Sequence, residues 1–278
     1  MKTIRGENAP NNLMKFIDLS IPIANGFQCD PPLTEPHVVY HTHDQGVEEM
    51  SFAFPHLKPE YLPSGTGWAT ETLTVNTHSG THMDAPWHFA PVMDREIGET
   101  RAWTIDEVPL EWCVGPLVVL DFADLEDGYV MQPADIDAKL QELGHAIQPG
   151  EIVCVHTSAP QYFGTADYVN HGIGVGKEGT LHILRQGIHV VGTDAWSWDA
   201  PFAITAVKWK ESLKAKQPAT QLIWEGHYAG IERGYFQLEK LANLDQVPAV
   251  GATMYCFPVK IAGASAGWVR AVATMPEV

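Results

Sequence analysis

One short segment of the chain carries most of the residues that could do chemistry: His78, His82, Asp84 and His88. Imidazole nitrogen and carboxylate oxygen together form the ligand set that suits Zn²⁺, Mn²⁺ or Fe²⁺. The absence of thiolates from the segment argues against a closed structural zinc site. Asp84 could bridge two metal ions, because a carboxylate has two oxygens. The alternative is a polar loop of solvated histidines, since the chain contains 13 of them.

The sequence around these residues constrains their backbone. Gly80 permits a positive φ angle, and Pro86 locks its own φ angle. Ser79 and Thr81 can hydrogen-bond to the backbone or to the ligands. Residues 69–77, directly before the segment, alternate in polarity and are rich in β-branched side chains, which predicts a strand that anchors it. These constraints favour a metal site over a loop of solvated histidines.

Strands and helices are expected to alternate along the rest of the chain. Short apolar runs predict strands at residues 16–23, 115–121, 152–156, 188–194, 249–258 and 268–274. Helices are predicted at residues 132–144 and 177–186. This alternation indicates the α/β class, with a mixed β-sheet core and flanking helices. We expect a single domain over residues 1–278, with a loose lead-in at 1–15 and a long loop region at 24–67.

The composition is that of a globular protein, with 45% hydrophobic and 18% charged residues. The formal net charge of −17 repels phosphate backbones and anionic lipid, so we expect neither a nucleic-acid nor a membrane partner. The four cysteines are far apart and are interpreted as reduced, and the first residues lack the apolar stretch of a signal peptide. These features predict a cytoplasmic protein that binds a small molecule.

The segment from His78 to His88 matches the signature HxGTHxDxPxH and thereby resembles the cyclase-like metal-dependent hydrolases, the family of kynurenine formamidase and isatin hydrolase type. The resemblance extends over most of residues 16–274. Residues 17–20 are similar to the opening strand of the family, and residues 192–199 to its GxDxxSxD segment. The resemblance implies an α/β fold of the swivelling β/β/α kind.

The same resemblance implies a second ligand cluster. Members of the family carry a histidine and, twelve residues later, an acidic residue in an ExLxxL context, a pattern that His227 and Glu239 match. Glu232 competes with Glu239, but its spacing from His227 does not fit. A glutamate rather than a glutamine at position 239 favours two metal ions. The expected cofactor is therefore Zn²⁺ or Mn²⁺, one or two per chain, held by the four residues of the first segment with His227 and Glu239.

Such a site predicts a hydrolase in which metal-activated water attacks an amide, lactam or ester carbonyl. His88 and Glu239 are the predicted catalytic residues, with His88 as the candidate proton shuttle if it is not fully used as a ligand. The one Gly-x-Ser-x-Gly match, at residues 263–267, lies between two predicted strands and not between a strand and a helix as a nucleophile elbow does, so a serine nucleophile has little support. The alternatives are a lactonase, cyclase or dehydratase acting on a hydroxy-acid or polyketide-like substrate, a non-catalytic binding protein, and a structural metal domain.

Aromatic residues near the motif give the only indication of the substrate. Phe52, Trp68, Trp87 and Trp196 are the predicted substrate-binding residues, and they favour a cyclic or aromatic compound. The alternative for any one of them is an ordinary core position. The family resemblance implies a homodimer or homotetramer, in which a long N-terminal loop reaches the site of a neighbouring subunit.

Overall fold

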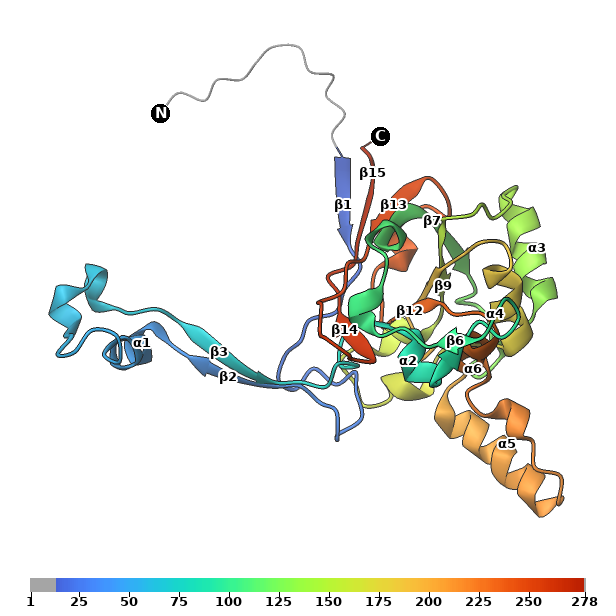
Figure 1. Ribbon diagram of the computed structural model, residues 1–278, viewed down its shortest axis with the longest axis horizontal. Coiled ribbons are helices and arrows are strands. Elements are labelled where there is room, and N and C mark those ends of the chain that lie inside the picture. Colours follow the sequence, from blue (N-terminus) through green and yellow to red (C-terminus); the bar gives the residue numbers. More distant parts are fainter. Residues whose placement is uncertain (1–13, 278) are drawn as a thin grey trace, which may run out of the picture.

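The computed structural model describes residues 14–277, whose centre is one curled, mixed β-sheet of nine strands (Figure 1). The strand order is β1-β15-β13-β7-β9-β11-β12-β4-β14. The four central strands β7, β9, β11 and β12 are parallel, and antiparallel strands continue the sheet on both sides. The mixed sheet, the flanking helices and the α/β class confirm the fold predicted from the sequence.

The strands are β1 (Met14–Asp18), β2 (His37–His41), β3 (Thr70–Thr74), β4 (His82–Asp84), β5 (Val92–Met93), β6 (Thr100–Arg101), β7 (Val114–Asp121), β8 (Val130–Met131), β9 (Ile152–His156), β10 (Gly174–Val175), β11 (Val190–Thr193), β12 (Phe236–Glu239), β13 (Ala252–Tyr255), β14 (Ala266–Trp268) and β15 (Val272–Pro276). The helices are α1 (His43–Met50), α2 (Pro86–Phe89), α3 (Pro133–Leu143), α4 (Lys177–Leu184), α5 (Phe202–Lys214) and α6 (Glu225–Glu232).

The core lies on both faces of the central strands. In β9, Ile152 and Cys154 pack into one hydrophobic cluster, and Val153 and Val155 pack into another on the opposite face. A strand that is buried on both faces has a continuous run of apolar residues in its sequence. For this reason the bounds of β9, residues 152–156, were predicted correctly. Among residues 14–277, no helix is both long enough and apolar enough to cross a membrane.

An arm projects from the body of the molecule (Figure 1). It contains regular elements within residues 24–67, where the sequence predicted a long loop. Strands β2 and β3 pair antiparallel from His37↔Thr74 to His41↔Thr70, and α1 lies beyond them. The sequence did not indicate α1 because only Gly46 and Val47 are buried in it, so it has no apolar stripe.

Two further boundaries differ from the prediction. The strand expected at residues 268–274 is divided: β14 pairs with β4, whereas β15 pairs with β13 and β1 on the other side of the sheet. Of the lead-in predicted at residues 1–15, residues 1–13 lie outside the described part of the chain, and the last two residues already belong to β1.

Candidate metal centre

A tight turn followed by a short strand presents the first ligands. Gly80 has the positive φ angle, 64°, that its sequence position suggested. The turn leads into β4, which is buried between β12 and β14 and pairs His82 with Glu239 across the antiparallel ladder. The sheet thereby brings together two predicted ligands that are far apart in the sequence.

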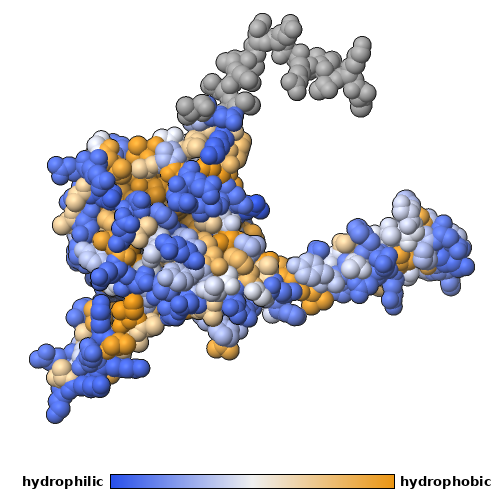
Figure 2. All heavy atoms as spheres, turned by 180° about the vertical axis from the view of Figure 1, so that it is seen from behind, coloured by the Kyte–Doolittle hydropathy of each residue, from blue (hydrophilic) through white to orange (hydrophobic). Residues whose placement is uncertain are grey.

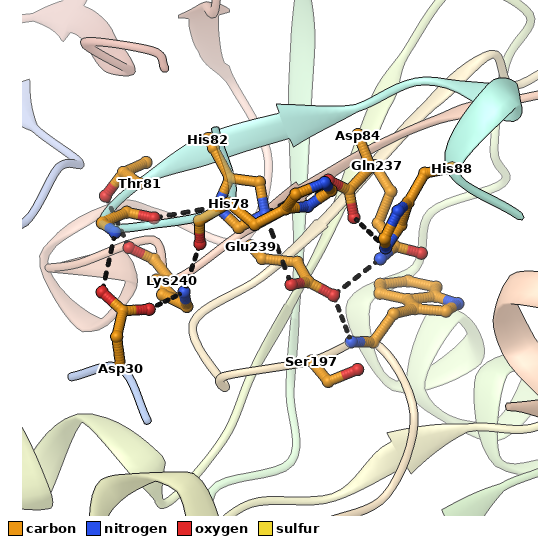
Figure 3. Close-up of polar contacts among 12 residues, drawn as sticks. Asp30, His78, Thr81, His82, Asp84, His88, Ser197, Gln237, Glu239 and Lys240 are labelled. Atoms are coloured by element: carbon orange, nitrogen blue, oxygen red, sulfur yellow. Dashed lines mark hydrogen bonds and ion pairs between the residues drawn. The ribbon is translucent and has the colours of Figure 1, made fainter. Parts of the chain in front are cut away.

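Asp84 is the centre of the cluster (Figure 3). Its Oδ1 atom lies 2.8 Å from Nδ1 of His78 and 3.2 Å from Nε2 of His82. Its Oδ2 atom lies 3.8 Å from Nε2 of His227 and 4.0 Å from Nε2 of His88. Two sets of three residues can each offer ligand atoms to one ion, and Asp84 is common to both sets: His78, His82 and Asp84 form the first, and Asp84, His88 and His227 form the second.

Glu239 lies beside both sets. Its Oε2 atom is 3.6 Å from Nε2 of His82, and its Oε1 atom is 3.5 Å from Nε2 of His227. Its carboxylate is fixed by hydrogen bonds that Oε1 accepts from the backbone N–H of Trp198 at 3.0 Å and from the amide of Gln237 at 2.8 Å. Glu232, the competing candidate, instead ends α6 and pairs with Lys177.

The unsatisfied atoms of the site fit a metal ion. Among the described residues, Nε2 of His82 and both carboxylate oxygens of Asp84 are fully buried and make no hydrogen bond. The 2.8 Å contact of Oδ1 with Nδ1 of His78 is an ion pair without hydrogen-bond geometry. Leaving such groups unpaired costs about 1–3 kcal/mol each, and more when they are charged. Imidazole nitrogens and carboxylate oxygens are ligands for Zn²⁺ and Mn²⁺ alike, so a divalent cation would satisfy all three atoms.

Burial and neighbouring charges set the protonation of the ligands. Burial by itself would raise the pKa of the Asp84 carboxyl, but the nearby imidazoles, His82 foremost, outweigh burial and hold that pKa well below its usual value. Burial also lowers the pKa of His88 to about 4. Asp84 is therefore an anion and His88 a neutral imidazole at pH 7, the forms in which these groups bind metals.

Supporting residues orient the imidazoles. Nδ1 of His82 donates to the carbonyl of Gly80 at 2.8 Å, which directs Nε2 toward the cluster. Nδ1 of His227 makes a close hydrogen bond to Asp199, which also accepts from the backbone N–H of Gly226 at 2.8 Å. In the sequence, Asp199 stands out only as part of the segment 192–199, because its partner His227 follows 28 residues later.

A cavity of about 230 Å³ opens above the ligands. Its walls include Trp196, as predicted, and also Phe202 and Trp224, which the sequence analysis missed. The cavity is also lined by Asp30, Pro31 and Thr34, which belong to the segment that leads into the arm. Its remaining lining residues are His78, His88, Ser197, His227, Glu239 and Lys240.

The other three predicted substrate contacts lie outside this cavity in the single chain. Trp68 and Phe52 belong to the arm: the Trp68 indole donates to Glu49 at 2.9 Å, and Phe52 is 97% exposed. Trp87 lies within the metal motif, directly before His88, but its side chain is 44% exposed and its backbone N–H donates to the carbonyl of Trp103. In the single chain, β3 runs into the motif from outside the body, so closeness in sequence does not place the rings of Phe52 and Trp68 at the ligands.

The buried ligand set, together with relatives that are named hydrolases, defines a metal-dependent hydrolase. The model of the Cyclase family, described as "Putative cyclase", matches residues 17–200, and the chain belongs to this family.

Named relatives agree with this class. The isatin hydrolase of Roseibium aggregatum is 28% identical over 232 residues, which cover 80% of this chain and 81% of the relative. The kynurenine formamidase of Maricaulis maris is 28% identical over 200 residues, which cover 72% of this chain and 78% of the relative.

Solved structures share the fold. Isatin hydrolase A from Labrenzia aggregata, bound to benzyl benzoate, superposes with a TM-score of 0.70 at 24% identity and covers 95% of this chain and 94% of its own. A structure described as a "potential metal-dependent hydrolase with cyclase activity" has a TM-score of 0.63 at 20% identity and covers 96% of this chain and 100% of its own.

Proposed function

We propose that this chain hydrolyses the amide bond of a small aromatic compound, an N-acyl arylamine or an aryl lactam. The observation that carries the proposal is the set of unsatisfied ligand atoms on Asp84 and His82. Asp84 contacts His78, His88 and His227, which line a cavity with the aromatic walls Trp196, Phe202 and Trp224. Relatives named isatin hydrolase and kynurenine formamidase support the choice of amide over lactone chemistry.

The proposed ligands are His78, His82, Asp84, His88 and His227, with Glu239 beside both sets. A divalent ion, when bound, supplies a Lewis acid for the carbonyl and lowers the pKa of a bound water. The residues of the chain orient the reaction: Asp84 lies between the two sets, and the hydrogen bonds on Oε1 of Glu239 leave Oε2 directed at the cluster.

The number of ions tests this arrangement. We expect elemental analysis of untagged protein, purified without chelator, to give two equivalents of Zn or Mn, because Asp84 offers one oxygen to each set. One equivalent would remove Glu239 or His227 from the ligand set. If no metal is present and none is regained on dialysis, the proposal fails. A panel of formanilides, isatin-like lactams and lactones then separates amide hydrolysis from the lactonase alternative.

His88 is the proposed proton acceptor. Its imidazole is neutral, lines the cavity and lies at the long end of the ligand distances, 4.0 Å from Asp84. Because His88 is also a proposed ligand, we expect His88→Asn to lower kcat by about 10²–10⁴-fold when turnover is measured per bound metal ion in protein saturated with Zn²⁺. Unchanged turnover would exclude the proton-transfer role, and loss of metal would assign His88 as a ligand alone.

The arm supports a proposal of self-association into a dimer or tetramer. An isolated two-stranded ribbon has marginal stability in water, and every residue of β3 is exposed in the single chain. Light scattering on the full chain tests this, and a monomeric mass at micromolar concentration would contradict it.

The four cysteines, all buried and unpaired among the described residues, support a reducing, cytoplasmic compartment, which cell fractionation tests.

A further inference from the structure

Trp224 has a backbone conformation that bulky residues avoid. It precedes α6 with a φ angle of +55°, in the left-handed region. Its indole stacks on His227, with ring centroids 4.4 Å apart, and meets His88 edge-on at 5.0 Å. Strain of this kind persists where the surrounding structure imposes it, and it is concentrated at functional sites. The strained backbone places the indole against two of the proposed ligands.

The same indole forms part of a second hollow. An apolar groove of about 400 Å³ runs along α5 and shares Trp224 and Phe202 with the metal cavity. Its other lining residues are Thr205, Ala206, Trp209 and Ile223. Figure 2 shows apolar side chains gathered where the projecting helix α5 joins the body, at the lower left. Trp224 therefore separates the ligands from a continuous apolar surface.

The sizes of the two hollows indicate that they work together. Sites for small molecules usually have volumes of roughly 300–1,000 Å³, and the metal cavity alone has about 230 Å³. The groove adds an uncharged, mainly hydrocarbon surface, although the chain as a whole has a net charge of −17. A ligand that uses the groove must therefore carry an apolar, uncharged group.

We propose that the groove along α5 binds an apolar extension of the substrate, so that the substrate class is an aryl amide or lactam that carries an alkyl or aryl substituent. This inference rests on the proposed function, because the ring must lie at the metal cavity for the substituent to pass Trp224 and Phe202. Continuity of the groove with the catalytic cavity favours this occupant over a second copy of the chain.

A series of ring-alkylated formanilides, from unsubstituted to butyl at the meta or para position, tests the inference. In whichever series fits the groove, meta or para, we expect kcat/KM of the metal-loaded enzyme to rise about two- to fourfold for each added CH₂, as for burial of a methylene. Most of this rise should come from a lower KM. Ala206→Trp fills the groove and should flatten this dependence. Val207→Trp places the same side chain at an exposed neighbouring position of α5 that does not line the groove, so it should preserve the dependence.

The other outcomes separate this inference from the proposed function. If formanilide is hydrolysed but kcat/KM is independent of chain length, the inference is overturned and the proposed function stands. If no formanilide is hydrolysed, the proposed function fails for this class, and calorimetry with ring-alkylated benzamides decides the inference: affinity that grows with chain length supports it, and constant affinity overturns it. If Ala206→Trp changes the oligomeric mass while the wild-type series is flat, the groove is a subunit contact and the inference is wrong.

Discussion

A buried ion pair between Lys240 and Asp30 makes the strongest prediction about stability. The Lys240 side chain is 2% exposed; its ammonium pairs with Asp30 and donates to the carbonyl of His78 at 2.6 Å. Asp30 also accepts from the backbone N–H of Gly80 at 3.1 Å. The pair therefore attaches the segment before the arm to the turn that carries the first ligands.

Lys240→Met would leave the Asp30 carboxylate buried without its cation. Removing one partner of a buried pair costs about 3–5 kcal/mol. We therefore expect a loss of about 3–5 kcal/mol in the free energy of unfolding, measured by urea denaturation of metal-free protein at pH 7. Metal affinity should fall as well, because the carbonyl of His78 loses its donor.

The double variant Asp30→Asn/Lys240→Met decides whether charge is the cause. Because it removes both charges, most of the lost stability should return. If the double variant is as unstable as Lys240→Met, the reasoning from an unpaired charge is refuted and packing explains the loss. Arg270→Met is the matched control: it breaks an exposed ion pair with Asp18 on β1 and should leave the denaturation midpoint unchanged.

Two further predictions concern carboxylates that hold histidines. Asp199→Asn should weaken metal binding by about 10–100-fold in a chelator competition, because Asp199 orients His227, and unchanged affinity would contradict this role. Burial opposes the charge on His156, but a 2.5 Å hydrogen bond to Asp194 outweighs burial and raises the pKa of His156 above 6.5. This stabilisation is complete below pH 6.5 and is lost as pH rises through the folded-state pKa, so the Tm difference between wild type and His156→Gln should shrink from pH 6 to 9; a constant difference would refute it.

The parts of the fold that were predicted correctly are those whose signals are local. Helix α3 was recognised because Gly144 follows it with a φ angle of 62°, a left-handed cap that glycine adopts without strain. Of the arm, β3 was predicted as the strand at residues 69–77, whereas β2 and α1 were missed. β4 was missed as well, since β2 and β4 are defined by pairing with distant segments. β4 has only three residues and is defined by its partners β12 and β14.

The residues of the metal centre show the same difference between local and long-range signals. The structure brings together the six ligands predicted from the sequence, four of which lie within one segment and two of which, His227 and Glu239, were predicted from the family spacing. The residues that support them were missed because their contacts are long-range. Lys240 and Asp30 are 210 positions apart, and no periodic pattern in one sequence relates such a pair. Trp224 was missed because its role comes from a strained backbone, which composition does not reveal.

The spacing of the motif follows from the strand that carries it. Side chains alternate between the faces of a strand, so His82 and Asp84 share one face of β4 while Met83, fully buried, packs into the hydrophobic core on the other. Directly paired residues of neighbouring strands lie on the same face, and the register pairs His82 with Glu239 and Asp84 with Gln237. The family pattern H-x-D is therefore the two-residue repeat of a buried strand, and its acidic partner must come from an adjacent strand in a fixed register. A slip of one residue in this register would direct Glu239 into the hydrophobic core and remove it from the ligands.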